Sequence, residues 1–300
     1  MTSKLSKVLA VAATPLLLAA CGGGSGGPGG PGGGTGGSGD NSFVGFPIPP
    51  SSKLALKGIG QEASVDAKAG TISEFASDNI SADVSTDKDG KITALALKTT
   101  SGTKTWNTEN SELVTREGVI AAIGDDAHSV IVADPEDNEF KYQTFGAWET
   151  AGDTEGTGRV GVFSVGSETA AADIPTSGTA KFKGASGGIY GNEEGDSFIV
   201  TSDASLDVNF AAKSVGFKTE NTRELENGTA LSGLDLDGQM SYAGGAMSGS
   251  VENVAKTMSG KAQGQFYGAG AAEVGGTFAL KGGSPGATEA FVGGFGAVKQ

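Results

Sequence analysis

Cysteine and histidine each occur once among the 300 residues, which excludes chemistry that needs several of them. With a single Cys the chain forms no intramolecular disulfide. A structural zinc site needs three or four Cys, His or carboxylate ligands, and a hydrolytic triad needs a base that activates its nucleophile. The lone His128 follows Asp125 and Asp126, and we expect it in an exposed turn. We therefore expect no catalytic residues, no metal ligands and no enzyme.

Positive charge is also scarce, because 35 Asp and Glu outnumber 21 Lys and Arg and give a formal net charge of −14. A surface of that sign repels phosphate backbones and anionic lipid headgroups. We therefore expect no nucleic acid partner and interpret the charge as a solubility feature. Attraction of a basic partner is the alternative interpretation.

Long hydrophobic runs and aromatic residues are few, whereas Gly is abundant at 52 residues. Many Ser, Thr and Val stand between the glycines, and this composition favours short strands and tight turns over long helices. A hydrophobic fraction of 37% in 300 residues is compatible with a packed core in one or two domains. The composition therefore predicts an all-β protein.

The first 20 residues have the pattern of a secretory signal peptide. Lys4 and Lys7 precede an apolar run at 8–20 that is too short to span a bilayer and that ends in small residues. The tetrapeptide LAAC at 18–21 is a lipobox, which predicts cleavage before Cys21 and lipid attachment to its thiol. Each acyl CH₂ buried in a membrane contributes about 0.8 kcal/mol, so several chains would anchor the protein firmly. The alternative is an ordinary secreted protein with a chance Cys.

A Gly-rich tether follows the lipobox. Residues 22–39 are almost entirely Gly with Ser, Thr and Pro, a composition that behaves as a flexible coil. A phosphate-binding loop is excluded, since no predicted strand precedes the run, no helix follows it and no Lys-Ser or Lys-Thr closes it. We expect the signal peptide at 1–20 and the lipidated Cys with its tether at 21–42.

The region 43–172 predicts a β-rich subdomain. Alternating residues predict strands at 92–97, 129–132, 140–148 and 159–165. The strand at 140–148 is apolar on both faces, so we expect it to be buried or to lie at a junction. Residues 112–123 are the best helix candidate, weakened by Gly118 and by β-branched side chains. Trp106 and Trp148 are interpreted as core residues, with contact anchors for a partner as the alternative.

The region 173–300 predicts an antiparallel meander. Strand candidates lie at 179–184, from 188, and at 205–210, 214–219, 234–240, 247–251, 289–297 and on both sides of a turn within 262–280. Eight or nine strands result, and eight close a barrel whose interior side chains can fill. Polar side chains on the outward faces predict a barrel in water and not a transmembrane one. These side chains are Lys181, Lys183, Asp207, Asn209, Asp235, Asp237 and Gln239.

Residues 264–280, GQFYGAGAAEVGGTFAL, are the most distinctive stretch. Period-2 alternation on both sides of a Gly-Ala turn predicts a β-hairpin with one apolar face. The stretch resembles the signature hairpin of the transferrin-binding-protein-B-like β-barrel, a domain of bacterial surface lipoproteins. Residues 141–148, 174–190 and 202–212 are also similar to segments of this family. The family commonly has Pro after the aromatic-Gly triplet, and Ala269 and Gly270 occupy that loop here, which predicts a more flexible turn.

The resemblance implies an all-β fold with a C-terminal eight-stranded antiparallel β-barrel at 173–300, preceded by a smaller β-rich handle-like subdomain at 43–172. It implies a non-enzymatic outer-membrane lipoprotein whose relatives capture host iron carriers, haem, haem proteins or complement regulators. Some relatives reach the cell surface through a dedicated outer-membrane translocon. Gly22, where inner-membrane retention usually has Asp, fits this destination. We expect the cell surface, with the periplasmic face as the alternative.

The leading functional interpretation is a ligand-binding protein in iron or haem acquisition, with membrane contact through the lipid anchor and an iron-carrier protein as partner. The alternative is a structural or adhesive surface lipoprotein with no small-molecule ligand. We expect no cofactor, and haem is the alternative. The spacing of the candidate haem-iron ligands in the sequence does not single out any two of them. The candidates are His128, Tyr190, Tyr242, Tyr267, Met240, Met247 and Met258. The ligand-binding residues stay unassigned.

Three short polar segments have a structural interpretation. The acidic stretches at 87–90 and 134–138 offer oxygen atoms to Ca²⁺, but neither has the alternating loop with a distal bidentate Glu. We interpret both as solvated turns. The sequon NGT at 227–229 is also interpreted as a turn.

Overall fold

The computed structural model describes residues 45–300 except 67, 117, 125–127 and 285–288. Cys21, the predicted signal peptide and the predicted Gly-rich tether lie outside the described residues. Strands dominate, and the helical elements of the described chain are two 3₁₀ turns, η2 (Ala171–Asp173) and η3 (Ser232–Leu234). None of the described helices is long and apolar enough to cross a bilayer. The prediction of an all-β protein is therefore confirmed.

The N-terminal half forms one antiparallel sheet of ten strands. Its strands are β1 (Lys53–Asp66), β2 (Thr71–Ile72), β3 (Ala76–Thr86), β4 (Ile92–Thr99), β5 (Gly102–Asn107), β6 (Ser111–Arg116), β7 (Val119–Gly124), β8 (Ser129–Ala133), β9 (Gln143–Ala151) and β10 (Thr157–Gly166). The order is β5-β4-β3-β1-β10-β9-β8-β7-β6, with β2 paired to β1. The end strands β5 and β6 contact each other, so the sheet curls until it is nearly closed.

The C-terminal half is a closed antiparallel barrel. Its strands are β11 (Thr179–Gly191), β12 (Ser197–Asn209), β13 (Ser214–Glu224), β14 (Leu236–Ala243), β15 (Ala246–Asn253), β16 (Met258–Tyr267), β17 (Glu273–Gly282) and β18 (Glu289–Lys299). Each strand pairs with the next along the chain, and β11 pairs with β18 to close the ring. Eight strands match the predicted number, and the C-terminal eight-stranded barrel is confirmed.

Aromatic side chains fill the barrel. Phe217 and Phe295 stack with ring centroids 4.4 Å apart, and Phe278 meets Phe291 edge to face at 4.9 Å. All four are at most 1% exposed. These rings belong to one continuous core cluster inside the barrel, as expected for eight strands whose interior side chains fill the ring. The predicted filled interior is therefore present.

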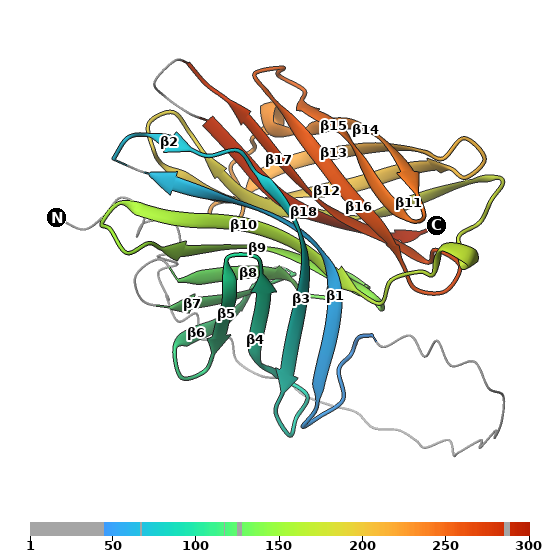
Figure 1. Ribbon diagram of the computed structural model, residues 1–300, viewed down its shortest axis with the longest axis horizontal. Helices are drawn as coiled ribbons and strands as arrows, with labels where there is room; N and C mark the ends of the chain where they lie inside the picture. Colours follow the sequence, from blue (N-terminus) through green and yellow to red (C-terminus); the bar gives the residue numbers. More distant parts are fainter. Residues whose placement is uncertain (1–44, 67, 117, 125–127, 285–288) are drawn as a thin grey trace, which may run out of the picture.

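The ten-stranded sheet and the barrel share an extensive interface, in which β1, β9 and β10 lie against β17 and β18 (Figure 1). Glycines on the outer face of the barrel allow this close approach. A Cβ at Gly294 would lie 2.8 Å from the Cβ of Phe145, and one at Gly296 would clash with the Gln143 amide. The predicted junction at 140–148 is confirmed, because β9 is buried along almost its whole length.

The signature hairpin consists of β16 and β17, joined in the register Phe266 to Val274 and Tyr267 to Glu273. Its apolar face lines the barrel core through Phe266, Val274 and Phe278, as predicted. Its second face is also buried, since Glu273 and Thr277 are at most 2% exposed under the ten-stranded sheet. The prediction of a single apolar face was therefore incomplete.

The predicted helix at 112–123 is wrong. The segment is the hairpin of β6 and β7, in which Glu112 pairs with Ile123 and Arg116 with Val119. Gly118 has φ +77°, a left-handed conformation that Gly adopts without strain and that turns the chain between the strands. Pairing of β7 with β8 then extends the sheet, and this tertiary pairing overrides the local helical pattern.

Several strand boundaries also differ from the prediction. Residues 179–184 and 188–190 belong to one long strand, β11, and the first half of β12 was missed. In the first half of the chain the sequence did not indicate β1, β3 or β5. The sequences of β1 and β3 are rich in Gly, Ser, Ala and Asp, which have weak strand propensity, so pairing with neighbouring strands decides their conformation.

Candidate binding site

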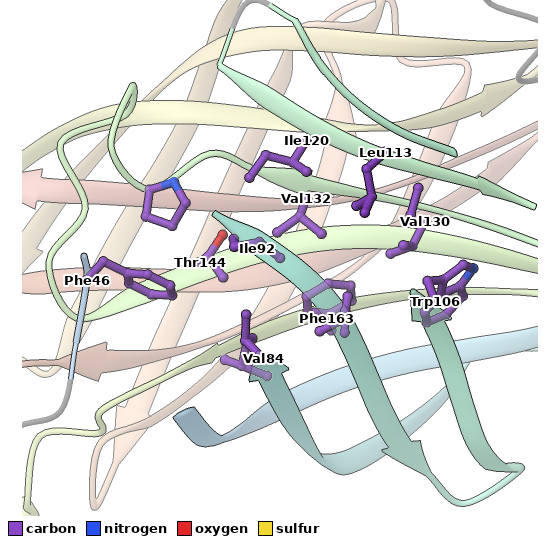
Figure 2. Close-up of a pocket in the computed structure, with 14 residues that line it drawn as sticks. Phe46, Val84, Ile92, Trp106, Leu113, Ile120, Val130, Val132, Thr144 and Phe163 are labelled. Carbon is purple, nitrogen blue, oxygen red and sulfur yellow. The ribbon is translucent and has the colours of Figure 1, made fainter. Parts of the chain in front are cut away.

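The interior of the ten-stranded sheet holds a small apolar cavity of about 40 Å³. Its lining includes residues from eight strands, β3 to β10, and Figure 2 shows Phe46 and Trp106 at opposite ends. Thr144 is the polar residue of the lining, and its hydroxyl donates to the Ala133 carbonyl at 2.6 Å. Thr144 is therefore hydrogen-bonded, whereas the buried Nε1 of Trp106, which also lines the cavity, has no partner among the described residues.

A wider groove lies at the mouth of this sheet. Its volume is about 750 Å³, and it shares Phe46, Ile92 and Leu113 with the lining of the cavity. The segment at 46–48 forms one wall and is fixed by a hydrogen bond from the Phe46 N–H to the Lys141 carbonyl at 2.8 Å. The segment is the first described stretch after the predicted tether. The groove therefore lies where the chain enters the fold.

The groove combines apolar and charged side chains. Phe46 and Pro47 supply apolar surface, and Lys91, Glu136 and Glu139 supply charge. Mixed surfaces with an aromatic anchor and a charged rim are typical of contacts between proteins. Among the residues that line it there is no His, Tyr, Met or Cys, the side chains that hold haem iron. The groove is chemically suited to a protein partner.

The opposite end of the sheet interior is closed by a cluster of buried charges. Glu62 is 5% exposed and accepts hydrogen bonds from Arg159 at 2.8 Å and from the Ser101 hydroxyl at 2.7 Å. Lys104 donates to the same Ser101 hydroxyl at 2.7 Å and lies over the Trp148 ring at 4.3 Å. These residues form the charge cap.

Electrostatics within the charge cap keep Glu62 ionised. Burial alone would raise the pKa of Glu62, but the Ser101 hydrogen bond and the charges of Arg159 and Lys104 outweigh it and lower the pKa. Burial lowers the pKa of Lys104, and the neighbouring Glu62 charge opposes that change. The charge cap is thus a connected structural network, in which the buried Nε of Arg159 is the atom without a hydrogen-bond partner among the described residues.

Specific hydrogen bonds join the sheet and the barrel across their buried interface, although the side-chain amide of Gln143 is buried there without a partner among the described residues. Gln61 donates to the Thr277 hydroxyl at 3.0 Å, and the hydroxyls of Ser164 and Tyr267 lie 3.0 Å apart. Glu273 accepts the backbone N–H of Lys141 at 2.7 Å. Burial raises the pKa of Glu273, and this hydrogen bond offsets part of the rise. These bonds fix how the two sheets dock.

The aromatic and His candidates from the sequence are structural. Trp106 and Trp148 are at most 2% exposed, so the core interpretation of both is confirmed. The expectation that His128 is exposed is wrong, because its ring is partly buried and stacks on Trp106 at 4.9 Å. Its Nε2 lies 3.1 Å from the Thr105 carbonyl oxygen. His128 is therefore held in place on the outside of Trp106.

The haem-ligand candidates do not converge on an open site. Met240, Met247 and Met258 lie in the barrel core together with Tyr242. Tyr267 is fully buried at the sheet–barrel interface, and Tyr190 donates a short hydrogen bond to Glu289. Within the part of the chain that the structure describes, no group of three or more His, Cys, Asp or Glu side chains could hold a metal ion.

The polar segments are turns, as predicted. Asp87 accepts the backbone N–H groups of Asp89 and Lys91 at 2.9 and 3.0 Å. Asp134 accepts the N–H of Glu136, and the turn at the sequon is closed by the N–H of Gly228 bonded to the Glu224 carbonyl. The side-chain oxygen atoms of these loops are thus used within the turns.

The charge cap and the groove were not found from the sequence. Glu62, Lys104 and Arg159 are isolated charges in separate strands, and only the register of β1 with β10 and of β4 with β5 brings them together. The sequence signal for the charge cap is a charged residue within an alternating strand segment. The same pattern occurs where a strand face is exposed to solvent. Periodicity alone could not separate the two.

Comparison with known proteins assigns the barrel. Residues 174–299 match the family model described as the C-lobe and N-lobe beta barrels of Tf-binding protein B. The barrel of this chain is therefore transferrin-binding-protein-B-like, as the sequence predicted. A search of curated proteins gave no match. The Tf-binding-protein barrel covers β11 to β18, so the match includes every strand of the closed ring.

Solved structures of bacterial binding proteins are also similar to this chain. A transferrin-binding protein B mutant from Haemophilus parasuis has 12% identity and a TM-score of 0.42, over 84% of this chain and 78% of that one. The protein from serogroup B Neisseria meningitidis has 13% identity and a TM-score of 0.42, over 84% and 77%. The N-lobe of lactoferrin-binding protein B from Moraxella bovis has 15% identity and a TM-score of 0.33, over 64% and 81%. The family assignment rests on the match at 174–299.

Proposed function

We propose that this protein is a non-enzymatic binding protein, anchored to the outer membrane by lipid on Cys21, that captures a host iron-carrier protein. The observation that carries the proposal is the match of residues 174–299 to the barrels of Tf-binding protein B. The lipobox at 18–21 supports the anchor, and the Gly-rich segment after it would hold the fold away from the membrane surface. Display on the cell surface through an outer-membrane translocon belongs to the same proposal.

The groove at the mouth of the ten-stranded sheet is the proposed contact surface. The barrel interior is filled, so a partner must bind to outer surfaces or to loops. The groove offers an aromatic side chain, Phe46, beside the charges of Lys91 and Glu136. Because the groove has no haem-iron ligand, a protein carrier fits it better than free haem.

Binding assays with a chain that begins at residue 41 test this proposal. Immobilised protein would be exposed to transferrin, lactoferrin and haemoglobin, and haemin would be titrated and followed by its visible absorption. Saturable capture of one carrier protein is expected. If none is captured and haemin gives no saturable change, iron capture is refuted and a structural or adhesive role is favoured.

A charge reversal locates the contact. Lys91→Glu in the groove should weaken carrier binding at least about tenfold, since it alters a charge at the rim of the contact. Lys181→Glu is the matched control, because Lys181 is exposed on the barrel and lies outside the groove. Equal affinities for the two variants would place the contact elsewhere.

The anchor and its location need separate tests. Cys21→Ser should release the protein from the membrane fraction, and retention there would contradict lipid attachment at this residue. Protease added to intact cells should degrade the protein, whereas cleavage only after lysis would place it on the periplasmic face.

A further inference from the structure

A second recess lies between the ten-stranded sheet and the barrel, and we call it the crevice. One wall comes from β7, β8 and β9, and the other comes from β11, β12 and β13. Its volume is about 190 Å³. Clefts that hold drug-sized ligands span about 300 to 1,000 Å³, so this crevice suits a smaller molecule.

The crevice contains a cation without a partner. Arg223 lines it and is exposed, and in the described chain its guanidinium makes no ion pair and no hydrogen bond. Two other exposed cations of β11 and β13 have carboxylate partners, Lys181 in Asp207 at 3.4 Å and Lys218 in Asp237 at 3.5 Å. Arg223 is therefore free to bind an anionic group, and its planar fork matches a carboxylate.

A carboxylate and an unpaired hydroxyl lie beside Arg223. Thr201 faces Arg223 across the strand pair, and its Oγ1 is shielded from solvent with no hydrogen-bond partner. Asp203 also lines the crevice and does not form an ion pair with Arg223, although it accepts a hydrogen bond from the Asn221 amide at 2.7 Å. Opposite charges that share a crevice without pairing leave both available to a ligand that carries both signs.

A bulge in β13 builds this arrangement. The register shifts between Thr201 and Asp203, and Asn221 has φ +58°, a left-handed conformation that Asn tolerates. Bulges redirect side chains and occur next to functional sites. On one side of the bulge Thr201 pairs with Arg223, and on the other side the regular pairing begins with Asp203 and Glu220.

Apolar side chains make up part of the remaining wall, together with the polar Asn138, Ser186 and Ser202. Phe145 and Ile131 are buried and come from the ten-stranded sheet, and Ile199 comes from the barrel. We propose that this crevice binds a free α-amino acid with an apolar side chain. The carboxylate lies at Arg223, the ammonium group lies at Asp203, and the side chain lies against Phe145, Ile131 and Ile199. The site is distinct from the proposed carrier contact and does not depend on it.

Calorimetric titration of the full chain with L-leucine and L-phenylalanine tests the site. Saturable binding with one site per chain is expected. Arg223→Ala should weaken L-leucine binding by about tenfold or more, because a charge-assisted bidentate contact is lost. Lys218→Ala is the matched control, since it removes an exposed cation from the same strand outside the crevice and should leave the affinity unchanged.

Analogues that lack one charge test the assignment of each end. 4-Methylpentanoate has no ammonium group, so its affinity should not change in Asp203→Asn, whereas that of L-leucine should fall several-fold. Thr201→Val should fold at least as stably as the original chain, because it removes a hydroxyl without a partner. Circular dichroism on each variant separates lost binding from lost structure.

Two results would overturn the proposal. The first is the absence of saturable heat with both amino acids for folded protein. The second is equal L-leucine affinity for Arg223→Ala and the original chain. Tighter binding of 4-methylpentanoate than of L-leucine would overturn the role given to Asp203.

Discussion

The barrel and the ten-stranded sheet enclose their interiors in different ways. In the barrel every strand pairs with its neighbours along the chain, and stacked Phe side chains fill the centre. In the ten-stranded sheet the edges β5 and β6 only contact each other, and the interior keeps a cavity of about 40 Å³. Of the described charged residues that are buried, Glu62, Lys104 and Glu149 belong to this sheet, whereas Glu273 lies on the outside of the barrel.

The difference indicates a division of roles. Full closure satisfies all strand edges and fixes the register, which gives the barrel the properties of a rigid scaffold. The ten-stranded sheet has a groove at one end and a charge cap at the other. Substitutions at these two ends can therefore change the surface of the sheet while the barrel stays folded. The four predictions that follow test this contrast, beginning with the largest expected effect.

Removal of an aromatic ring from the barrel centre should have the largest effect. Phe295 is 0% exposed and stacks on Phe217. Phe295→Ala should lower the free energy of unfolding by about 3 to 5 kcal/mol, because a closed barrel cannot collapse into the space that the ring leaves. Chemical denaturation measures the change. A loss below about 1 kcal/mol would contradict the rigid interior.

A buried carboxyl in the ten-stranded sheet should make its stability depend on pH. Burial raises the pKa of Glu149 from its ordinary 4.5 to about 8, so the folded chain retains a proton that the unfolded chain has released. Stability from this group should fall as pH rises from about 4.5 to about 8. Relative to the original chain, Glu149→Gln should gain up to about 5 kcal/mol at the upper end, from about 1.4 kcal/mol per pKa unit.

Denaturation curves of the two chains at several pH values measure this effect. The difference between them should vanish in acid, where Glu149 is protonated in both the folded and unfolded states. Since burial also raises the pKa of Glu273, each chain should lose some stability with rising pH, and the difference isolates Glu149. A difference that does not vary with pH would show that Glu149 is not desolvated.

One substitution made in both interiors compares their packing directly. Ala262 lies in the barrel core at 1% exposed, and Ala122 lines the cavity of the ten-stranded sheet at 4% exposed. Ala262→Val should cost about 1 to 3 kcal/mol by overpacking. Ala122→Val should be neutral or should stabilise by about 0.5 kcal/mol, because the cavity receives the added methyl groups. Equal losses would mean that the two interiors are equally tight.

The smallest effect concerns one hydrogen bond between the two sheets. Tyr267→Phe removes the bond to Ser164, for which the two oxygens lie 3.0 Å apart, and should cost about 1 kcal/mol. Ser164→Ala in the same chain should recover part of this loss, since no hydroxyl is then left unpaired. Additive losses in a double-mutant cycle would show that the two hydroxyls do not interact.

Strong local patterns were sufficient for the barrel. The alternation in residues 264–280 predicted β16 and β17, and short alternating segments elsewhere predicted the eight-stranded antiparallel meander. The same pattern at 140–148 predicted a strand buried on both faces, and β9 has that position. These predictions succeeded because side chains in a strand alternate between two faces, so a repeat of two residues records which face is buried.

Weak or ambiguous local patterns failed in the ten-stranded sheet. The segment at 112–123 is compatible with a helix by spacing, and it forms β6 and β7 because partner strands are available on both sides. The strands β1 and β3 have few residues of high strand propensity. Their conformation depends on ladder hydrogen bonds to each other and to β10, which join residues distant in sequence.

The sequence by itself determined the all-β class, the barrel, and the scarcity of Cys and His that argues against most metal and triad chemistry. The tertiary structure alone decided the contents of the sites. Glu62 meets Lys104 and Arg159, and Thr201 meets Arg223, only through strand register and a bulge. The physical reason is that alternation records which face of a strand is buried, whereas the neighbours of a side chain depend on long-range pairing that no local window contains.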